Sequence, residues 1–296
     1  MAVPGRLLAI DIDGTLVRSD FSISPRTLRA LRLATRSGVI VCLATGRPLN
    51  SALRFRREIG STGPIVVLDG AAALSAAGEV LEQRPLDPGL VKGIAALALR
   101  ERQGVAVQTL ERVYLSRRRR VHLMATHWLH HRMAVHWNGW RHAFWDLRQR
   151  RTTLRRPSDL DAVAGPLVKV SIFGPFGPVT RVRAEIVRRF PAGYRFTLPE
   201  EAGTEIVAEG TSKASGIEAV LRHLGLGWED VVAVGDNWND REMIARAGLG
   251  VAMGNAPAPI RAQAAHVTGS VDEDGLADVV EKILAGLPLP GASARR

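Results

Sequence analysis

The sequence contains almost no cysteine, since Cys42 is the only one among 296 residues. No intramolecular disulfide can form, which excludes a small secreted fold held together by disulfides. Long hydrophobic runs are also missing, because no stretch approaches the ~18–20 apolar residues that span a bilayer. The N-terminal region has no basic segment followed by a long apolar one, as a secretory signal would. We therefore expect a soluble cytoplasmic protein with no membrane partner.

Lysine is scarce as well, so a lysine in a special place stands out. The composition is otherwise ordinary for a globular protein, with 46% hydrophobic and 23% charged residues. A chain of this length and composition can bury a sizeable core, in one large domain or two smaller ones. The lysines are Lys92, Lys169, Lys213 and Lys282.

The net charge of +11 is concentrated in one basic stretch, residues 112–156. Between Glu111 and Arg156 lie twelve arginines and two acids, and the stretch also holds four of the six tryptophans. Such a run is most often a solvated face. Two further interpretations are an acidic or polyphosphorylated substrate attracted by the charge and, less favoured, nucleic acid bound through arginine and stacked tryptophan.

Three histidines in the same stretch have the spacing of one helix face. They are His127, His130 and His131. This spacing could hold a transition metal, but no nearby cysteine or acidic ligand supports that interpretation.

The two ends of the chain alternate apolar strand-like runs with helical ones. This order predicts an α/β fold with a doubly wound, Rossmann-like parallel sheet covered by helices. In the helix at 22–38, Ser24 is the expected N-cap and Pro25 the first helical residue. The expected strands are 6–12, 39–46, 63–70, 230–236, 250–254 and 266–270, and the expected helices are 22–38, 48–60, 211–225, 239–248, 256–265 and 275–286.

The middle of the chain follows a different and less regular pattern. Its elements are a helix at 87–104, strands at 105–110, 112–116, 166–174 and 193–198, and a helix at 179–190. We interpret this region as an α/β cap domain inserted into the first domain. The predicted division is a discontinuous core of residues 1–84 and 190–296 and an inserted domain of residues 85–189.

Acidic residues follow the predicted strands of the core at the point where each strand ends. The first strand ends at the segment that holds Asp11 and Asp13, and a later strand ends at the segment that holds Asp236 and Asp240. In an open parallel sheet, ligands bind beyond the carboxyl ends of the strands. Four carboxylates gathered there would repel one another unless a cation lay among them, and Mg²⁺ prefers such oxygen ligands. The sequence therefore predicts Mg²⁺ as a cofactor.

Lys213 and Thr45 add groups that favour an anion. Lys213 begins a helix, where the macrodipole disfavours a cation unless an anion binds nearby. Thr45 offers a hydroxyl at a strand end, and Gly46 adds backbone N–H. Acids, a metal, a hydroxyl and a lysine together indicate a site for phosphoryl transfer. An ordinary solvated lysine and a strand-end threonine remain the structural alternatives.

Four segments of the sequence resemble, in order, the motifs of the haloacid-dehalogenase-like (HAD) phosphohydrolases. They are "DIDGTL", "LATGR", "SKASGI" and "VGDNWNDREMI". The run from "GDNWND" through "GVAMGNA" to "DEDGL" is similar to the Cof-type subfamily, whose cap is inserted between the second and third motifs. The resemblance covers roughly residues 6–84 and 190–285.

This resemblance implies a role for each matching residue. Asp11 would be the nucleophile that forms an aspartyl-phosphate, and Asp13 the general acid and then the base. The implied phosphate-binding residues are Thr45, Gly46, Lys213 and Asn239, and the implied metal ligands are Asp11, the main-chain carbonyl of Asp13, and Asp236, with Asp240 in or near the metal shell.

Two acidic positions are less clear from the residues alone. Asp240 could instead be the N-cap of the helix that follows it. Asp69 stands where the family usually has Asn, and because its negative charge would oppose a phosphate, we assign it no role.

The expected function is that of a Mg²⁺-dependent phosphatase acting on a small phosphorylated metabolite, such as a sugar phosphate, through an aspartyl-phosphate. A mobile cap would close over the site and exclude water. One alternative is a phosphomutase or phosphotransferase using the same residues. Another is a nucleic-acid-binding protein that uses the basic stretch. No oligomeric state follows from the sequence.

Overall fold

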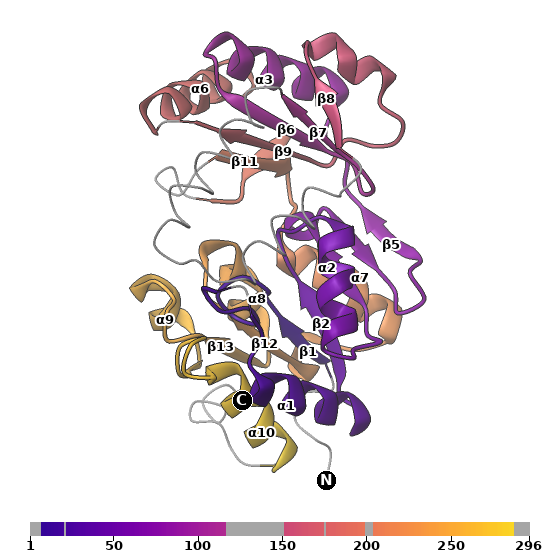
Figure 1. The fold of residues 1–296 in the computed structure, drawn as a ribbon, viewed down its shortest axis with the longest axis vertical. Coiled ribbons are helices and arrows are strands. Elements are labelled where there is room, and N and C mark those ends of the chain that lie inside the picture. The colour runs from indigo at the N-terminus through magenta and orange to yellow at the C-terminus, as the bar shows by residue number, and fades with distance from the viewer. Residues whose placement is uncertain (1–6, 21, 117–150, 175, 199–203, 287–296) are drawn as a thin grey trace. The chain divides into compact units, whose positions relative to one another are not determined.

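The chain forms two units, each with its own sheet, in a computed structural model. Unit 1 comprises Met1–Gln83 and Ser212–Arg296, and unit 2 comprises Arg84–Thr211. The described residues are 7–20, 22–116, 151–174, 176–198 and 204–286 (Figure 1).

The second boundary differs from the one that the sequence predicts. The expected division after residue 189 would place the strands at 194–196 and 204–208 in the core. Both strands instead belong to the sheet of unit 2, so the division falls between residues 211 and 212. The first division falls after residue 83, one residue before the expected position.

The sheet of unit 1 has eight strands in the order β14-β13-β12-β1-β2-β3-β4-β5. All the pairings from β14 to β3 are parallel, and β4 and β5 add an antiparallel edge. The sequence pattern missed β4 and β5, because small alanines and exposed residues carry little strand signal. The strands are β1 (Leu7–Ile10), β2 (Ile40–Ala44), β3 (Ile65–Val67), β4 (Ala72–Leu74), β5 (Val80–Gln83), β12 (Val231–Gly235), β13 (Leu249–Ala252) and β14 (His266–Val267).

Helices cover the sheet of unit 1, which confirms the predicted fold class. Residues of α7, α8 and α9 form one buried cluster with Leu7 and Ala9 of β1. Helix α1 packs against α10 and against β2 (Figure 1). The helices are α1 (Pro25–Arg36), α2 (Leu49–Glu58), α7 (Lys213–Leu224), α8 (Arg241–Arg246), α9 (Ala258–Gln263) and α10 (Gly275–Leu284), with the 3-10 turns η1 (Leu68–Gly70), η4 (Trp228–Asp230) and η5 (Trp238–Asp240).

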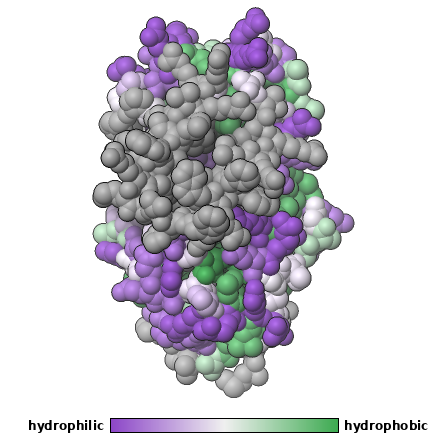
Figure 2. Space-filling view, viewed as in Figure 1, coloured by the Kyte–Doolittle hydropathy of each residue, from purple (hydrophilic) through white to green (hydrophobic). Residues whose placement is uncertain are grey.

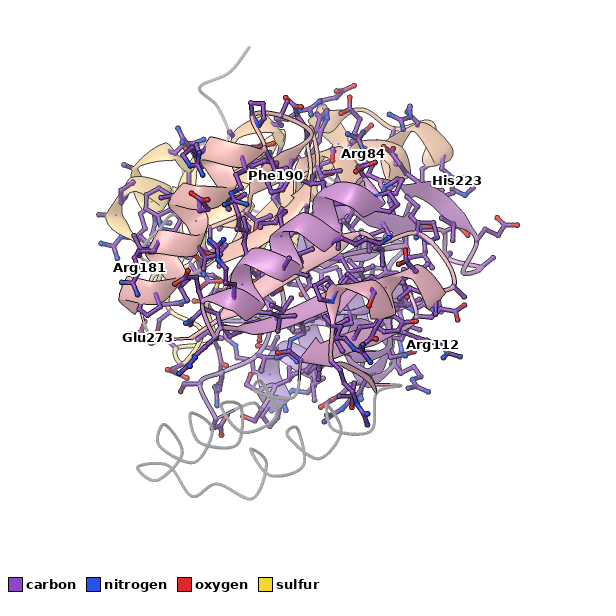
Figure 3. All side chains as sticks on the ribbon, turned by 90° about the horizontal axis from the view of Figure 1, so that it is seen from above. Arg84, Arg112, Arg181, Phe190, His223 and Glu273 are labelled. Carbon is purple, nitrogen blue, oxygen red and sulfur yellow. The ribbon has the colours of Figure 1, made fainter. Side chains whose placement is uncertain are left out.

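Unit 2 has a six-stranded sheet in the order β10-β11-β9-β6-β7-β8. Its core lies between one face of this sheet and the helices α3 and α6, and Phe190 packs against it after α6 (Figure 3). The elements are α3 (Pro88–Arg100), β6 (Gly104–Gln108), β7 (Val113–Ser116), β8 (Arg151–Leu154), η2 (Pro157–Ala162), β9 (Lys169–Phe173), α6 (Phe176–Arg189), β10 (Tyr194–Phe196) and β11 (Thr204–Ala208).

A local signal in the sequence accounts for the start of α1. The Ser24 hydroxyl accepts a hydrogen bond from the Thr27 N–H, and Pro25 is the first residue of α1, as predicted.

Hydrophilic residues make up most of the described surface seen in Figure 2. Among the helices in the described part of the chain, none is long and apolar enough to cross a membrane.

Candidate active site

The site lies at the carboxyl edge of the parallel strands of unit 1. Strand β1 lies between β12 and β2 and is parallel to both. Asp11 therefore follows β1 at the same edge where Thr45 follows β2 and Asp236 follows β12. Strands β2 and β3 lie on one side of β1, and β12, β13 and β14 lie on the other, so the strand order reverses at β1. Open α/β sheets bind ligands at such a switch point.

Lys213 joins two of the predicted acidic residues. Its Nζ donates to Oδ1 of Asp11 and to Oδ1 of Asp240, at 2.6 Å in each case. Lys213 is the first residue of α7, just after the N-cap Ser212. Its side chain is 1% exposed, so the interpretation of Lys213 as a solvated helix residue is wrong.

Asp240 uses its second carboxylate oxygen to hold the loop that carries Asp236. Oδ2 of Asp240 accepts hydrogen bonds from the backbone N–H groups of Asp236 and Asn237, at 3.0 and 2.9 Å. Although Asp240 occupies the N-cap position of α8, its side chain makes no capping bond to that helix. The interpretation of Asp240 as having only a capping role is therefore wrong, and its fully buried carboxylate belongs to the acidic cluster.

Asp236 is held by polar groups from other loops. Its Oδ1 accepts from the Thr15 hydroxyl at 3.1 Å, and its Oδ2 accepts from Nδ2 of Asn255 at 3.2 Å. Gly14 has a φ of +80°, and a Cβ at that position would lie 2.3 Å from Oδ2 of Asp236. Only glycine therefore allows the turn after Asp13 to approach Asp236 this closely.

The acidic cluster suits a hard divalent cation. Asp11, Asp236 and Asp240 each offer a carboxylate oxygen, and these oxygens lie within 4.8 Å of one another. Burial raises the pKa of Asp11 well above its ordinary value even though Lys213 opposes this. Burial, reinforced by the charge of Asp240, raises the pKa of Asp236 to about 6. The Asp11 and Asp236 carboxylates thus lack sufficient positive charge nearby, and a bound cation would supply it.

The pKa of Lys213 shifts in the opposite sense from that of an isolated buried lysine. Burial alone would lower it, but the charges of Asp11 and Asp240 outweigh burial and raise the pKa above its ordinary value. Lys213 therefore carries its positive charge throughout the physiological pH range. It neutralises part of the cluster and is placed to stabilise negative charge on a bound group.

Thr45, Gly46, Asp69 and Asn239 form a second polar group at the same edge. The Thr45 hydroxyl is buried and accepts from the N–H of Arg47 at 3.1 Å, which leaves its own hydrogen for another acceptor. Nδ2 of Asn239 donates to Oδ1 of Asp69 at 2.8 Å. A Cβ on Gly46 would lie 2.8 Å from the same Asp69 oxygen, so the glycine makes room for this carboxylate.

Asp69 is a site residue that the sequence analysis left without a role. It is 1% exposed and has a left-handed backbone with a φ of 58° in η1, the turn that follows β3. Its charge contributes to the raised pKa of Lys213. Its place at the end of a core strand, like those of Asp11 and Thr45, is the signal that could have identified it.

Asp13 follows Asp11 at the same edge, and its side chain pairs with Arg47. Arg47 Nε and Nη2 donate to the two carboxylate oxygens of Asp13, at 2.7 and 2.5 Å. The side chain of Asp13 is 56% exposed. Arg47 is the last residue of the "LATGR" segment, but the motif pattern alone did not indicate a role for it.

The structure thus brings most of the predicted site residues together in unit 1. The predicted residues that share hydrogen bonds there are Asp11, Asp236, Asp240 and Lys213. The three spaced histidines and residues 117–150 of the basic stretch lie outside the described residues.

A parallel α/β core with a charged site at the carboxyl edge of its sheet is typical of an enzyme. The haloacid dehalogenase-like hydrolase family matches residues 8–280. The chain therefore belongs to this family, which confirms the resemblance seen in its motifs. The family and its phosphatase relatives confirm the expected enzyme class, a HAD-type phosphoric monoester hydrolase.

Curated relatives match over nearly the whole chain. The 5-amino-6-(5-phospho-D-ribitylamino)uracil phosphatase YitU of Bacillus subtilis is 28% identical over 278 residues, which cover 92% of this chain and 94% of that protein. An HMP-PP phosphatase of Serratia proteamaculans is 26% identical and covers 85% of this chain and 84% of that protein. A haloacid dehalogenase-like hydrolase from Bacteroides thetaiotaomicron has a similar structure, with a TM-score of 0.78, 25% identity, and coverage of 94% of this chain and 99% of its own.

Proposed function

We propose that this protein is a Mg²⁺-dependent phosphatase that hydrolyses a small phosphorylated metabolite by transferring the phosphoryl group to Asp11. The observation that carries the proposal is the position of Asp11, which lies within hydrogen-bonding distance of Lys213 and within one ligand cluster with Asp236. A nucleophile, a fixed cation and a cation-binding carboxylate at one sheet edge are what phosphoryl transfer requires.

Asp11 would act with the oxygen that does not accept from Lys213. The bond between this oxygen and phosphorus forms as the ester oxygen–phosphorus bond breaks, and Asp13 gives its proton to the leaving oxygen. Asp13 then takes a proton from water, the water oxygen attacks phosphorus, and the Asp11–phosphorus bond breaks to release phosphate. Thr45 and Lys213 would donate hydrogen bonds to the phosphoryl oxygens, with the Gly46 N–H and Asn239 beside them.

Asp11, Asp236 and the main-chain carbonyl of Asp13 would hold Mg²⁺, with Asp240 next to it. When bound, the ion neutralises charge on the phosphoryl oxygens and on the carboxylates. Three acidic side chains that each offer a carboxylate oxygen fit this ion better than a softer metal. The bond from Lys213 to Oδ1 restrains the Asp11 carboxylate, and in this proposal its other oxygen attacks phosphorus.

The relatives support a small phosphorylated metabolite as the substrate class. Their names give two different substrates, 5-amino-6-(5-phospho-D-ribitylamino)uracil and HMP-PP. The proposal therefore remains at the level of a class that includes sugar phosphates. A cytoplasmic location also stays a prediction.

The test is a panel of phosphate esters assayed with Mg²⁺ for the release of inorganic phosphate. We expect hydrolysis of at least one ester, and we expect Asp11→Asn to reduce it by about 10³-fold or more. Asp278→Asn on α10 makes the same chemical change at an ion pair with Arg26 and serves as the control. Full activity of Asp11→Asn, or no hydrolysis of any ester, would overturn the proposal. Release of a phosphorylated second product instead of phosphate would indicate a phosphotransferase.

A further inference from the structure

We propose that Arg47 is a positioning residue that holds the Asp13 carboxylate in the orientation in which it transfers protons. The inference rests on the proposed function, because it concerns the proton that Asp13 gives to the leaving group. Nothing in the motif pattern or in the relatives assigns Arg47 this role.

Arg47 is fixed by its own neighbours on α2. Its Nη1 donates to the Ser51 hydroxyl at 3.2 Å. Its guanidinium carbon lies 5.0 Å from the centre of the Phe55 ring, a distance at which the cation and the ring attract each other. The Arg47 side chain is only 16% exposed. The guanidinium is therefore held in one place by contacts that do not involve Asp13.

Asp13 is the exposed partner of this pair, at 56%. A carboxylate with that exposure would rotate among several orientations in water if nothing held it. The parallel bonds from Nε to Oδ2 and from Nη2 to Oδ1 fix both oxygens and hence the plane of the carboxylate. The rigid Arg47 therefore determines where Asp13 points.

This pairing leaves lone-pair positions on both Asp13 oxygens unoccupied by Arg47. The two bonds occupy two of about four lone-pair positions on the carboxylate. The remaining positions lie on the outer sides of the two oxygens, where a leaving oxygen or a water can approach. Arg47 and Thr45 also belong to one short loop after β2, in which the N–H of Arg47 holds the Thr45 hydroxyl. One loop thus orients a proposed phosphate ligand and the proposed proton donor together.

The test compares two esters that differ in their need for a proton donor. The leaving group of p-nitrophenyl phosphate is stable as an anion, whereas a sugar or other alkyl phosphate leaves as an alkoxide that requires a proton. Both esters yield the same intermediate on Asp11, so kcat/KM isolates the step in which the ester bond breaks. For Arg47→Gln we expect kcat/KM to fall about 10- to 100-fold for the alkyl ester and less than about threefold for p-nitrophenyl phosphate.

Arg54→Gln is the matched control. It removes a second guanidinium that stacks on the same Phe55 ring, at 5.5 Å, and leaves the Arg47–Asp13 pair intact. We expect Arg54→Gln to change the ratio of the two kcat/KM values by less than about twofold. Arg47→Lys keeps the charge but lacks the fork that makes two parallel bonds, so it should show the same ester dependence as Arg47→Gln. If Arg47→Gln fails to fold, as judged by thermal melting, Arg47→Lys carries the comparison.

Adding Arg47→Gln to Asp13→Asn completes the test. If Arg47 acts through Asp13, the double variant should be no slower on the alkyl ester than Asp13→Asn alone. An equal loss for both esters, a rise in KM with weaker inhibition by phosphate, or an additive loss in the double variant would each overturn the proposal. These outcomes differ from failure of the proposed function, in which the wild-type protein hydrolyses neither ester or Asp11→Asn remains active.

Discussion

Two buried lysines, one in each unit, show what distinguishes this site from an ordinary ion pair. Lys213 in unit 1 and Lys169 in unit 2 are 1% and 2% exposed. Lys169 pairs with Glu205 on the neighbouring strand at 2.8 Å, and the Glu205 side chain remains 25% exposed. Lys213 instead contacts Asp11 and Asp240, which are both buried.

The difference lies in the balance of charge rather than in burial. The pair in unit 2 has one cation for one acid, and the Ser171 hydroxyl also donates to Glu205. Around Lys213 the acids outnumber the cation, since Asp236 joins Asp11 and Asp240 in the cluster. A balanced pair stabilises a fold, whereas a surplus of buried carboxylates requires a further positive charge. The surplus therefore marks the functional site.

The largest expected effect comes from removing each lysine in turn. Lys213→Met should reduce kcat/KM by about 10²–10³-fold, because a fixed charge next to the nucleophile and the phosphoryl group is lost. Lys169→Met should change kcat/KM by less than about threefold and destabilise the protein by about 1–2 kcal/mol, because Glu205 loses its partner. Steady-state kinetics and urea unfolding measure the two effects. An equal fall in kcat/KM for both variants would contradict the distinction drawn between the two lysines.

We expect Mg²⁺ to stabilise the protein by binding to the acidic cluster around Lys213 and not to the Lys169–Glu205 pair. The stabilisation should be larger at higher pH. Burial raises the pKa of Asp11 well above its ordinary value and that of Asp236 to about 6. The proton on Asp236 therefore stabilises the fold below about pH 4, and this contribution is lost as the pH rises through about 6, while the proton on Asp11 acts in the same direction. Saturating Mg²⁺ should therefore raise Tm by roughly 5 °C at pH 8 and by less at pH 5. Asp236→Asn should remove the shift, and Glu205→Gln should retain it. A shift that is larger at pH 5 would contradict this account.

We expect the protein to lose more stability when alanine replaces a glycine packed against the acidic cluster than when it replaces a glycine with open space around it. Gly14→Ala places a Cβ 2.3 Å from Oδ2 of Asp236, whereas Gly225 at the end of α7 has a φ of +64° and open space around it. We expect Gly14→Ala to destabilise the protein by about 2–3 kcal/mol and Gly225→Ala by about 1 kcal/mol. Thermal unfolding checks the order, and only Gly14→Ala should also weaken the Mg²⁺-dependent rise in Tm.

The smallest expected effect concerns Asp69, the acid that opposes a phosphate. Asp69→Asn keeps an oxygen that can accept from Asn239 while removing one negative charge next to Lys213 and Gly46. Inorganic phosphate should then inhibit the enzyme about 3- to 10-fold more tightly. Glu205→Gln removes a charge from the balanced pair and should leave inhibition unchanged. Weaker inhibition of Asp69→Asn would show that the carboxylate helps phosphate binding.

Residues at strand ends were the most predictable part of the molecule. Apolar runs that end in Asp11, Thr45 and Asp236 place these residues at one edge, because parallel strands share a direction. The Ser24–Pro25 signal likewise placed the start of α1. These predictions depend on local patterns, which a sequence displays directly.

Contacts between distant segments were not visible in the sequence. The bond between Asp69 and Asn239 joins residues 170 positions apart, and the Arg47–Asp13 pair joins residues 34 apart. The second division between the units differs from the predicted one because no strand was predicted at β11, whose pairing with β10 and β9 joins both strands to the sheet of unit 2. Pairing and side-chain direction depend on the whole fold, which local patterns do not contain.

The most direct test of the central claim is to capture the phosphoryl group on Asp11. Asp13→Asn mixed with p-nitrophenyl phosphate and Mg²⁺ should release a burst of one nitrophenolate per protein, because this ester needs no proton donor and the next step lacks its base. After an acid quench, mass spectrometry should locate one phosphoryl group on the peptide that carries Asp11, and Asp11→Asn should show neither burst nor label. A burst with the label on another residue, or turnover by Asp11→Asn at the wild-type rate, would contradict the account.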